Sequence, residues 1–413
     1  MARSVALERW FLVLTLTLLT ATSAAAQTTV VVGKGRAAAD VAAVQAAVDR
    51  GGTVYLRGAF SFDQAPVDDR TILITKAVAI IGRSDARGNM PSISGGVIPF
   101  NIVAPGMRVT IEGIRVVAST AVAIRVISAA GLRIANVSIE RVKPMPLPTM
   151  PESGAFGIAM GGGSISGDVT IEKNSFDVGG TSGERSGGIV SSPQGFERGV
   201  RIRIAQNFIT NTTAHGIDLR NVMGSANIES NMVIAGRIGS QPAALADSFV
   251  DGIRCLGSGN YRIALNWVDV GYENAAGIRL QGNVATVPVT AALVTGNYVR
   301  MTAPSDVPAG SENAGIELRR ATVGVVVDNN LIHGVGRTAL SVASEPGRIS
   351  EGATLWFDTR WFSPGPTRPG VRSGADVSIA PGSIDTRVTG GPGSFSVDNQ
   401  GIRTVIEHWA VTP

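Results

Sequence analysis

The sequence predicts a solenoid of stacked β-coils, and two ladders of repeated residues support this fold class. The first is an asparagine that stands between two short apolar runs, at intervals from 24 residues (Asn207 to Asn231) to 38 residues (Asn136 to Asn174). A period of this size is typical of one supersecondary unit repeated along an axis. The seven members of this ladder are Asn136, Asn174, Asn207, Asn231, Asn266, Asn297 and Asn330.

The second ladder reads Gly-Ile-x-apolar and keeps step with the first. Between the ladders lie runs such as VTIEKN and VRIRIAQN, which alternate apolar and polar residues as half-buried strands do. Each coil is therefore expected to contain three short strands, with the glycines at tight corners. The ladder begins at Gly157, Gly188, Gly216, Gly252, Gly277 and Gly315, with Ala339 as a seventh member.

Stacking explains how such coils bury an apolar interior. One coil cannot cover its own isoleucines, whereas stacked coils align them into a continuous core. A buried amide without a partner costs about 1–3 kcal/mol, so inward asparagines are expected to bond to the next coil or to the turn backbone. The alternative is that the asparagines mark independent surface turns, but their register with Gly-Ile favours the ladder.

The order of asparagine turn, variable loop and Gly-Ile strand resembles the right-handed parallel β-helix proteins of the pectate-lyase-like superfamily, over roughly Val41 to Glu407. In that family the asparagine ladder lies between the second and third strands, and the variable loops follow the third. The resemblance implies an all-β fold, a right-handed parallel β-helix (solenoid) with an N-terminal capping helix. A repeat of this kind says little about activity.

The composition fits one elongated solenoid of 413 residues with 51 glycines and few aromatic residues. Residues 1–26 read as a secretory signal peptide, because Arg3 and Arg9 flank a short apolar run and Ala24 to Ala26 resemble a cleavage site. The mature domain, 27–413, is expected to be secreted or periplasmic, monomeric and without a membrane span.

Charge and cysteine content exclude some partners. Removing the signal peptide leaves 34 basic and 31 acidic residues, and no basic run carries interleaved aromatic residues, so nucleic acid is not an expected partner. Cys255 is the only cysteine, so no internal disulfide can form. Its inward place in the Gly-Ile ladder favours a small core residue over a reactive thiol.

The first elements form a cap. Asp40 is a plausible N-cap for a helix whose apolar residues Val41, Val44 and Val48 follow helical spacing, and Gly51 ends it. This helix and the following TVYL strand resemble the cap of β-helix carbohydrate enzymes. The boundaries expected are a cap at about 37–58, coils at about 59–345, and C-terminal coils with a closing cap at about 346–413.

Long segments follow the predicted third strands after Val142, Val178, Ala235 and Arg300. Because each occupies the same place in its coil, they should wall a groove on one side of the scaffold. Near the C-terminus, Trp356 and Trp361 are candidates for a sugar-stacking platform, with core packing as the alternative.

Charged residues concentrate on one predicted face. The positions beside the inward Ile and Leu of each Gly-Ile strand should point away from the core. One row then reads Ala159, Val190, Asp218, Arg254, Arg279, Glu317 and Ser341, and a second row reads Arg220, Leu256, Gln281, Arg319 and Ala343. At about 4.8 Å per coil, the charged part of the first row spans about 14 Å, the scale of a few sugar rings.

Arginine forks suit carboxylate groups, so this face predicts an acidic polysaccharide as ligand. The alternative is a solvated face of alternating salt bridges with no ligand. If a reaction occurs, Arg254 or Arg279 is expected to clamp a carboxylate, and His215, Asp218 or Glu317 to carry protons. Substrate contacts are expected from Arg220, Asp251, Gln281, Arg319, Trp356 and Trp361.

The resemblance places lyases and hydrolases on this same face, but the polygalacturonase-type motif set is missing, since Ala214-His215-Gly216 is only a partial echo of Gly-His-Gly. Asp247, Asp251 and Glu273 could supply calcium ligands, although their spacing matches no calcium loop. The function predicted is a carbohydrate-active protein that binds, and could cleave or epimerise, an acidic polysaccharide. The alternative is a non-catalytic surface adhesin or a periplasmic ligand-delivery protein.

Overall fold

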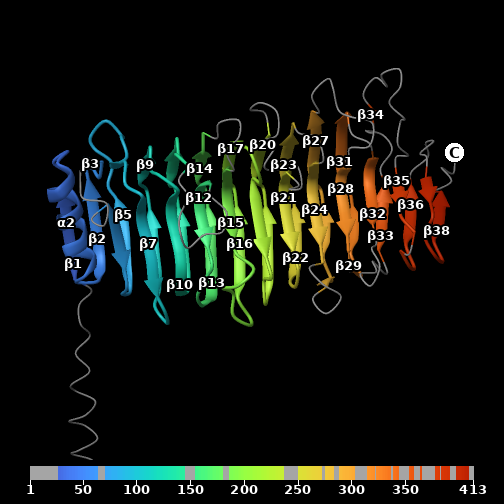
Figure 1. Ribbon diagram of the computed structural model, residues 1–413, viewed down its shortest axis with the longest axis horizontal. Helices are drawn as coiled ribbons and strands as arrows, with labels where there is room; N and C mark the ends of the chain where they lie inside the picture. The colour runs from blue at the N-terminus through green and yellow to red at the C-terminus, as the bar shows by residue number, and fades with distance from the viewer. Residues whose placement is uncertain are drawn as a thin grey trace, which may run out of the picture.

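The chain forms an elongated stack of coils in the computed structural model, and successive coils stand side by side along its long axis (Figure 1). The strand pairs that join one coil to the next are parallel, so the predicted right-handed parallel β-helix is confirmed. The structure describes residues 27–63, 70–144, 154–179, 186–236, 250–271, 275–282, 288–302, 314–320, 322–335, 338–343, 353–357, 363–364, 377–381, 383–390 and 397–408.

The strands form three parallel sheets, which we name by the order of the strands within a coil. The first-strand sheet contains β4 (Thr71–Ile74), β7 (Ile98–Ala104), the first half of β10 (Val122–Ala135), β12 (Ala155–Met160), β15 (Ser186–Ser191), β18 (Ile217–Arg220), β21 (Val250–Leu256), β24 (Ala275–Gln281), β28 (Ala314–Arg319), β32 (Thr338–Ala343), β35 (Val377–Ile379) and β37 (Val397–Asn399).

The second-strand sheet contains β1 (Thr28–Val32), β2 (Gly52–Arg57), β5 (Val78–Gly82), β8 (Val109–Glu112), the second half of β10, β13 (Ile165–Glu172), β16 (Arg201–Ala205), β19 (Ser225–Glu229), β22 (Asn260–Ala264), β26 (Leu293–Thr295), β30 (Val326–Asp328), β33 (Thr354–Phe357), β36 (Arg387–Gly390) and β38 (Val405–His408). A short separate pair is formed by β25 (Val289–Thr290) and β29 (Thr322–Val323).

The third-strand sheet contains β3 (Ala59–Ser61), β6 (Ser92–Ser94), β9 (Arg115–Val117), β11 (Ser138–Glu140), β14 (Ser175–Asp177), β17 (Phe208–Thr212), β20 (Met232–Ala235), β23 (Trp267–Val270), β27 (Tyr298–Thr302), β31 (Leu331–Val335) and β34 (Ser363–Pro364).

Aligned aliphatic side chains fill the interior of the stack. The isoleucine of each Gly-Ile strand pairs in register with the isoleucine of the next coil, and all of them are buried. The alternation of apolar and polar residues that predicted the strands therefore also sets their register, because a slip by one residue would turn every aliphatic side chain out of the core. This stack comprises Ile158, Ile189, Ile217, Ile253, Ile278 and Ile316.

The asparagine ladder is present, with six of its seven predicted members. Asn231 shows the pattern: its Nδ2 donates to Asn266 Oδ1 and to the backbone oxygen of Ile204, both at 2.9 Å, and its Oδ1 accepts from the Asn207 backbone N–H at 3.0 Å. The same bonds run from Asn174 to Asn330, so the buried amides satisfy one another as expected.

Asn136 is not a member of the ladder, which corrects the sequence-based prediction. Its side chain is exposed and its φ is 52°, the left-handed conformation that the residue before each ladder position adopts, as Lys173 and Gln206 also do. The ladder position of this coil is taken by Val137, whose backbone N–H donates to Asn174 Oδ1 at 2.9 Å. Asparagine tolerates the left-handed region well, which accounts for its presence at that point.

The Gly-Ile glycines do not serve tight corners, because none of the six has a positive φ. They stand where the first-strand and third-strand sheets approach closely. A Cβ added to Gly216 would lie 2.1 Å from Val233 Cγ1, and one added to Gly252 would lie 2.2 Å from Val268 Cγ1. Glycine therefore recurs at these positions because the two sheets approach closely across the core, and not because the backbone needs a positive φ.

The helix α2 (Ala37–Val48) lies at the N-terminal end of the stack (Figure 1) and buries Val44 and Val48 against it. Asp40 is in its first turn rather than at its N-cap, which is Arg36. The buried Asp40 carboxylate accepts hydrogen bonds from the backbone N–H groups of Lys34, Arg36 and Ser61 at 2.8–3.0 Å. It therefore ties the segment before the helix to β3 instead of capping the helix.

Several predicted features fall outside the described residues: the signal peptide, Asp247, Glu273, Trp361 and most of the long segments expected to wall a groove. β33 belongs to the second-strand sheet, and the stack continues beyond it through β35 to β38. In the described part of the chain, no helix has the length and apolar character needed to cross a membrane.

Candidate functional site

The charged residues named from the sequence are brought together on the first-strand sheet, in the two rows expected. In the first row, Asp218 pairs in register with Arg254, Arg254 with Arg279, and Arg279 with Glu317. The second row runs two residues further along each strand. We call the following set the first-strand cluster: His215, Asp218, Arg220, Asp251, Arg254, Arg279, Gln281, Glu317 and Arg319.

The side chains of the cluster are buried, which corrects the expectation that they form a solvent-facing strip. The exposed fractions are 0% for Arg279 and Asp251, 1% for Asp218 and 2% for His215. Alternation along a strand decides on which side of the sheet a side chain lies, whereas exposure depends on what packs over that side. Buried charges need partners, because removing an ion from water without one costs far more than most single contacts return.

Asp218 lies at the centre of one half of the cluster. Arg254 donates to it through two nitrogen atoms, Nε to Oδ1 at 3.0 Å and Nη2 to Oδ2 at 2.7 Å, and Arg220 Nε donates to Oδ2 at 3.0 Å. Burial opposes ionisation of this carboxyl group, but the charges of Arg254 and Arg220 outweigh burial and hold the pKa of Asp218 well below its ordinary value. Asp218 is therefore ionised.

Arg279 belongs to the other half. Its Nε lies 2.6 Å from Glu317 Oε2 and its Nη2 lies 3.3 Å from Asp251 Oδ1. Arg254 thus pairs with Asp218 of the preceding coil, whereas Arg279 lies between Asp251 of the preceding coil and Glu317 of the following one. Flanking carboxylates offset the repulsion of the two stacked guanidinium groups.

His215 lies between the two aspartates. Its Nδ1 accepts a hydrogen bond from the Asp251 backbone N–H at 3.2 Å and lies 3.7 Å from Asp251 Oδ2, and its Nε2 lies 4.0 Å from Asp218 Oδ2. An Nδ1 that accepts a backbone N–H leaves the proton of the neutral ring on Nε2, facing Asp218.

Asp251 behaves in the opposite way to Asp218. Its Oδ1 accepts the Ala276 backbone N–H at 3.0 Å, but burial dominates and raises the pKa of Asp251 above its ordinary value, with Arg279 and Arg254 only partly opposing it. Two carboxyl groups of one cluster therefore have pKa values shifted apart, which is the arrangement that separates a proton donor from a permanent anion.

The second row forms the accessible edge of the cluster. The side chains of Arg220 and Arg319 are 15% and 13% exposed, and Gln281 is 7% exposed. Trp356 has its backbone in β33 of the second-strand sheet, opposite Thr389 of β36. Within the described residues, no group of three or more His, Cys, Asp or Glu side chains is placed to hold a metal ion.

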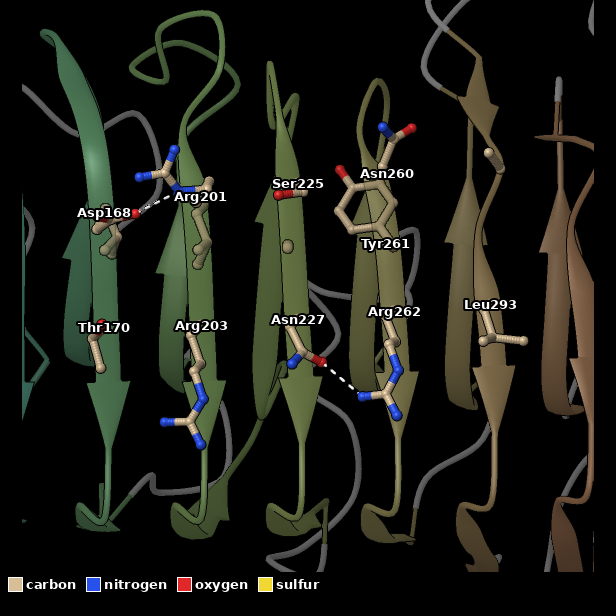
Figure 2. Close-up of a pocket in the computed structure, with 14 residues that line it drawn as sticks. Asp168, Thr170, Arg201, Arg203, Ser225, Asn227, Asn260, Tyr261, Arg262 and Leu293 are labelled. Carbon is tan, nitrogen blue, oxygen red and sulfur yellow. Dashed lines mark hydrogen bonds and ion pairs between the residues drawn. The ribbon is translucent and has the colours of Figure 1, made fainter.

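Another site lies on the second-strand sheet, where an open groove of about 530 Å³ runs over β13, β16, β19 and β22 (Figure 2). Polar and apolar side chains line it, among them Tyr261 and Leu293, and Arg201 pairs with Asp168 and Arg262 with Asn227 (Figure 2). The groove does not include the first-strand cluster.

Beside this groove, three arginines alternate with three glutamates over successive coils. Arg203 bonds to Glu172 on one side and, at 3.0 Å, to Glu229 on the other, and Arg262 lies 3.2 Å from Glu229. The arginine side chains are 40–47% exposed, so each pair adds little stability. The alternating salt bridges that the sequence raised as an alternative thus occur on a different face. We call this row the charge ladder: Glu112, Arg133, Glu172, Arg203, Glu229 and Arg262.

No family model matches this chain, and no curated protein matches it. Two solved structures are similar to it. The crystal structure of the Dettilon tailspike protein (gp208) has 15% sequence identity and a TM-score of 0.48, over 92% of this chain and 68% of that one. Bacteriophage CBA120 tailspike protein 3 (TSP3, orf212) has 12% identity and a TM-score of 0.35, over 92% of this chain and 58% of that one. Likenesses this distant carry no argument about activity or ligand.

Proposed function

We propose that this chain binds an acidic polysaccharide at the first-strand cluster and transforms it there, by cleavage or epimerisation. One observation carries the proposal: the cluster contains buried charge that the fold does not require. In the same row, Ala159 and Val190 occupy the positions of two earlier coils. Small apolar residues therefore suffice at this place, and perturbed ionisable groups beyond structural need are typical of functional sites.

The two aspartates supply the chemistry. Asp251, with its raised pKa, is the proton donor to the leaving glycosidic oxygen, His215 is the base that takes a proton from water or from the carbon beside a uronate carboxylate, and Asp218 stays ionised beside His215. General acid–base transfer of this kind serves both the cleavage of a glycosidic bond and the removal of a proton beside a uronate carboxylate.

The charge balance supports an acidic substrate. Four arginines share the cluster with three carboxyl groups, so positive charge is in excess even with all three carboxyl groups ionised. Because Arg254 is bound to Asp218 through two nitrogen atoms, it positions that carboxylate, while Arg220 and Arg319 at the accessible edge are the arginines that a substrate carboxylate reaches first. Such a polymer would be met outside the cytoplasm, in agreement with the predicted signal peptide.

Incubation of the purified protein with pectate, alginate and glycosaminoglycans tests this function. Lyase products are read as absorbance of unsaturated uronates, hydrolase products as reducing ends, and epimerisation as a change in uronate composition. His215→Gln and Asp251→Asn should abolish the product, whereas Asp168→Asn on the second-strand sheet should leave its rate unchanged. Equal rates in all four proteins would refute the proposal.

Burial of the cluster favours a second candidate, a non-catalytic β-helix that serves as an adhesin or as a ligand-delivery protein. With Arg279 and Asp251 at 0% exposure, the ion pairs would then only hold the coils in register. Binding to one of these polymers without any product in the three assays would establish this candidate.

A further inference from the structure

A row of exposed apolar side chains runs along the third-strand sheet, directly after the asparagine ladder. Phe208 is 42% exposed, Met232 36% and Trp267 46%, and Tyr298 and Leu331 are half-buried. The five residues pair in register from coil to coil through β17, β20, β23, β27 and β31. At about 4.8 Å per coil they cover about 19 Å along the helix axis. We call this row the aromatic strip.

The core does not need the aromatic strip. The residues that follow it on each strand, such as Ile209, Val268 and Val299, already fill the interior at 0% exposure. Earlier coils place small or charged residues in the same row. Those residues are Ser92, Arg115, Ser138 and Ser175.

Mostly polar side chains border the strip. On one side, Gln206, Ser230 and Asn329 are exposed in the turns of the asparagine ladder, and Leu265, at the same turn position beside Trp267, adds an apolar side chain that is 63% exposed. On the other side, Arg300, with a 39% exposed side chain, pairs in register with the exposed His333. Arg300 Nε lies 3.7 Å from Asp269 Oδ2, and that aspartate is itself buried, so the surface beside the strip presents the Arg300 guanidinium group.

Within the strip, the rings of Trp267 and Tyr298 lie with centroids 4.6 Å apart and planes inclined at 51°. An apolar surface one side chain wide is too narrow for a stable protein interface, which takes about 20–30 residues a side. It fits one extended chain whose units have an apolar face and polar edges. Sugar rings have this character, because their C–H faces pack on aromatic rings while hydroxyl and carboxylate groups bond at the edges.

We propose that the aromatic strip binds an extended glycan chain that carries carboxylate groups and lies parallel to the helix axis. Trp267 and Tyr298 stack against its rings, and Arg300 contacts its acidic groups. This surface lies on a different sheet from the first-strand cluster, so it goes beyond the proposed function and does not depend on catalysis.

Affinity electrophoresis of the full chain through gels that contain alginate, polygalacturonate, hyaluronan or a neutral glucan tests the proposal. Wild type should be retarded by at least one acidic polymer.

Trp267→Ala combined with Tyr298→Ala should weaken binding by at least about tenfold, from the loss of apolar area. Trp267→Phe should keep most of the binding, and Arg300→Gln should weaken it in a way that high salt diminishes. Tyr55→Ala, on the N-terminal strand β2, is the matched aromatic control and should bind as wild type does. Circular dichroism melts confirm that each variant is folded.

The proposal is overturned by an unchanged dissociation constant in the double variant, by retardation in the neutral glucan alone, or by no retardation in any gel. It is also overturned if wild type sediments as an oligomer and the double variant as a monomer, because the strip would then be an interface between copies of the chain. His215→Gln should lose product formation but keep retardation, so this proposal and the proposed function fail separately.

Discussion

Asp218 and Asp251 lie on neighbouring coils of one sheet, and both are fully buried, yet their carboxyl groups ionise differently. The difference comes from geometry. Asp218 accepts from two arginines, whereas Asp251 accepts from a backbone amide and meets Arg279 at 3.3 Å through one oxygen. Hydrogen bonds from cations compensate for the desolvation of the Asp218 carboxylate but not for that of the Asp251 carboxylate.

Asp251→Asn should therefore alter the pH dependence of stability. Because the folded pKa of Asp251 is raised above 3.8, the native state binds more protons than the unfolded chain between 3.8 and that raised value. The free energy of unfolding of wild type should fall relative to Asp251→Asn as pH rises through this interval, by about 1.4 kcal/mol per pH unit. Urea denaturation of both proteins between about pH 4 and pH 8 measures the difference. If the stability of wild type relative to Asp251→Asn rose with pH instead, the raised pKa would be contradicted.

Asp218→Asn should behave differently. The pKa of Asp218 is lowered in the native state, so its carboxylate stabilises the fold above pH 3.8, and the substitution should lower the free energy of unfolding at neutral pH.

Cys255 offers a reporter of unfolding. It is fully buried, as predicted for a core residue, and burial raises the pKa of its thiol well above the ordinary value, with the Asp218 charge adding to the effect. Since the thiolate is the reactive form, alkylation should require opening of the fold, and its rate should follow the population of the open form. Mass spectrometry of the single iodoacetamide modification in a urea series checks this, and a native rate equal to that of the urea-unfolded protein would contradict it.

At the scale of the element, what the sequence predicts well is the side of each strand and its register. The period-two alternation puts Asp218, Arg254, Arg279 and Glu317 in one row, and the register confirms it. Burial of that row could not be predicted, because it depends on segments distant in sequence. The sequence itself separates Asn136 from the ladder, because a ladder asparagine stands two residues before the inward residue of the third strand, as Asn174 does before Phe176, whereas Asn136 stands three before Ile139.

The close contact at the Gly-Ile ladder gives a test of packing between sheets. Gly252→Ala should destabilise the protein by about 1–3 kcal/mol, because the new Cβ would meet Val268 Cγ1 at 2.2 Å. Val268→Ala makes room, so the double variant should lose less than the sum of the two single effects. Chemical denaturation of the four proteins in a double-mutant cycle measures this coupling. Strict additivity would show that the glycine is needed for some other reason.

A buried asparagine of the ladder should contribute more to the free energy of unfolding than the exposed Asn136. Asn231→Ala removes an amide that serves Asn207, Asn266 and Ile204, so buried groups lose their partners and stability should fall by about 3 kcal/mol. Asn136→Gly removes an exposed amide at a positive φ that glycine accepts, and should change stability by less than about 1 kcal/mol. Equal effects of the two substitutions in guanidinium denaturation would argue against the six-membered ladder.

At the scale of the whole molecule, the first-strand cluster, the charge ladder and the aromatic strip occupy three sheets but overlapping coils in the middle of the stack. The N-terminal coils carry other residues at the corresponding positions, Arg125 and Ala159 in the cluster row and Ser92 and Arg115 in the strip row. Repetition lets one scaffold present different chemistry on each sheet, because a residue that points away from the core is free to vary while its inward neighbours keep the stack.

The same repetition predicts how far the effect of a destabilising substitution extends along the stack. In a solenoid each coil contacts mainly its neighbours, so a defect in one rung should loosen the adjacent coils and fade with distance. Hydrogen exchange of Asn231→Ala should show lost protection in β16, β19 and β22, whose turns hold Asn207, Asn231 and Asn266, and unchanged protection in β2 and β5 near the helix α2. The Asn136→Gly protein provides the reference for exchange in an intact ladder. A uniform loss of protection along the chain would mean that the stack unfolds as one cooperative unit, and the local stacking described for the ladder would then not govern its stability.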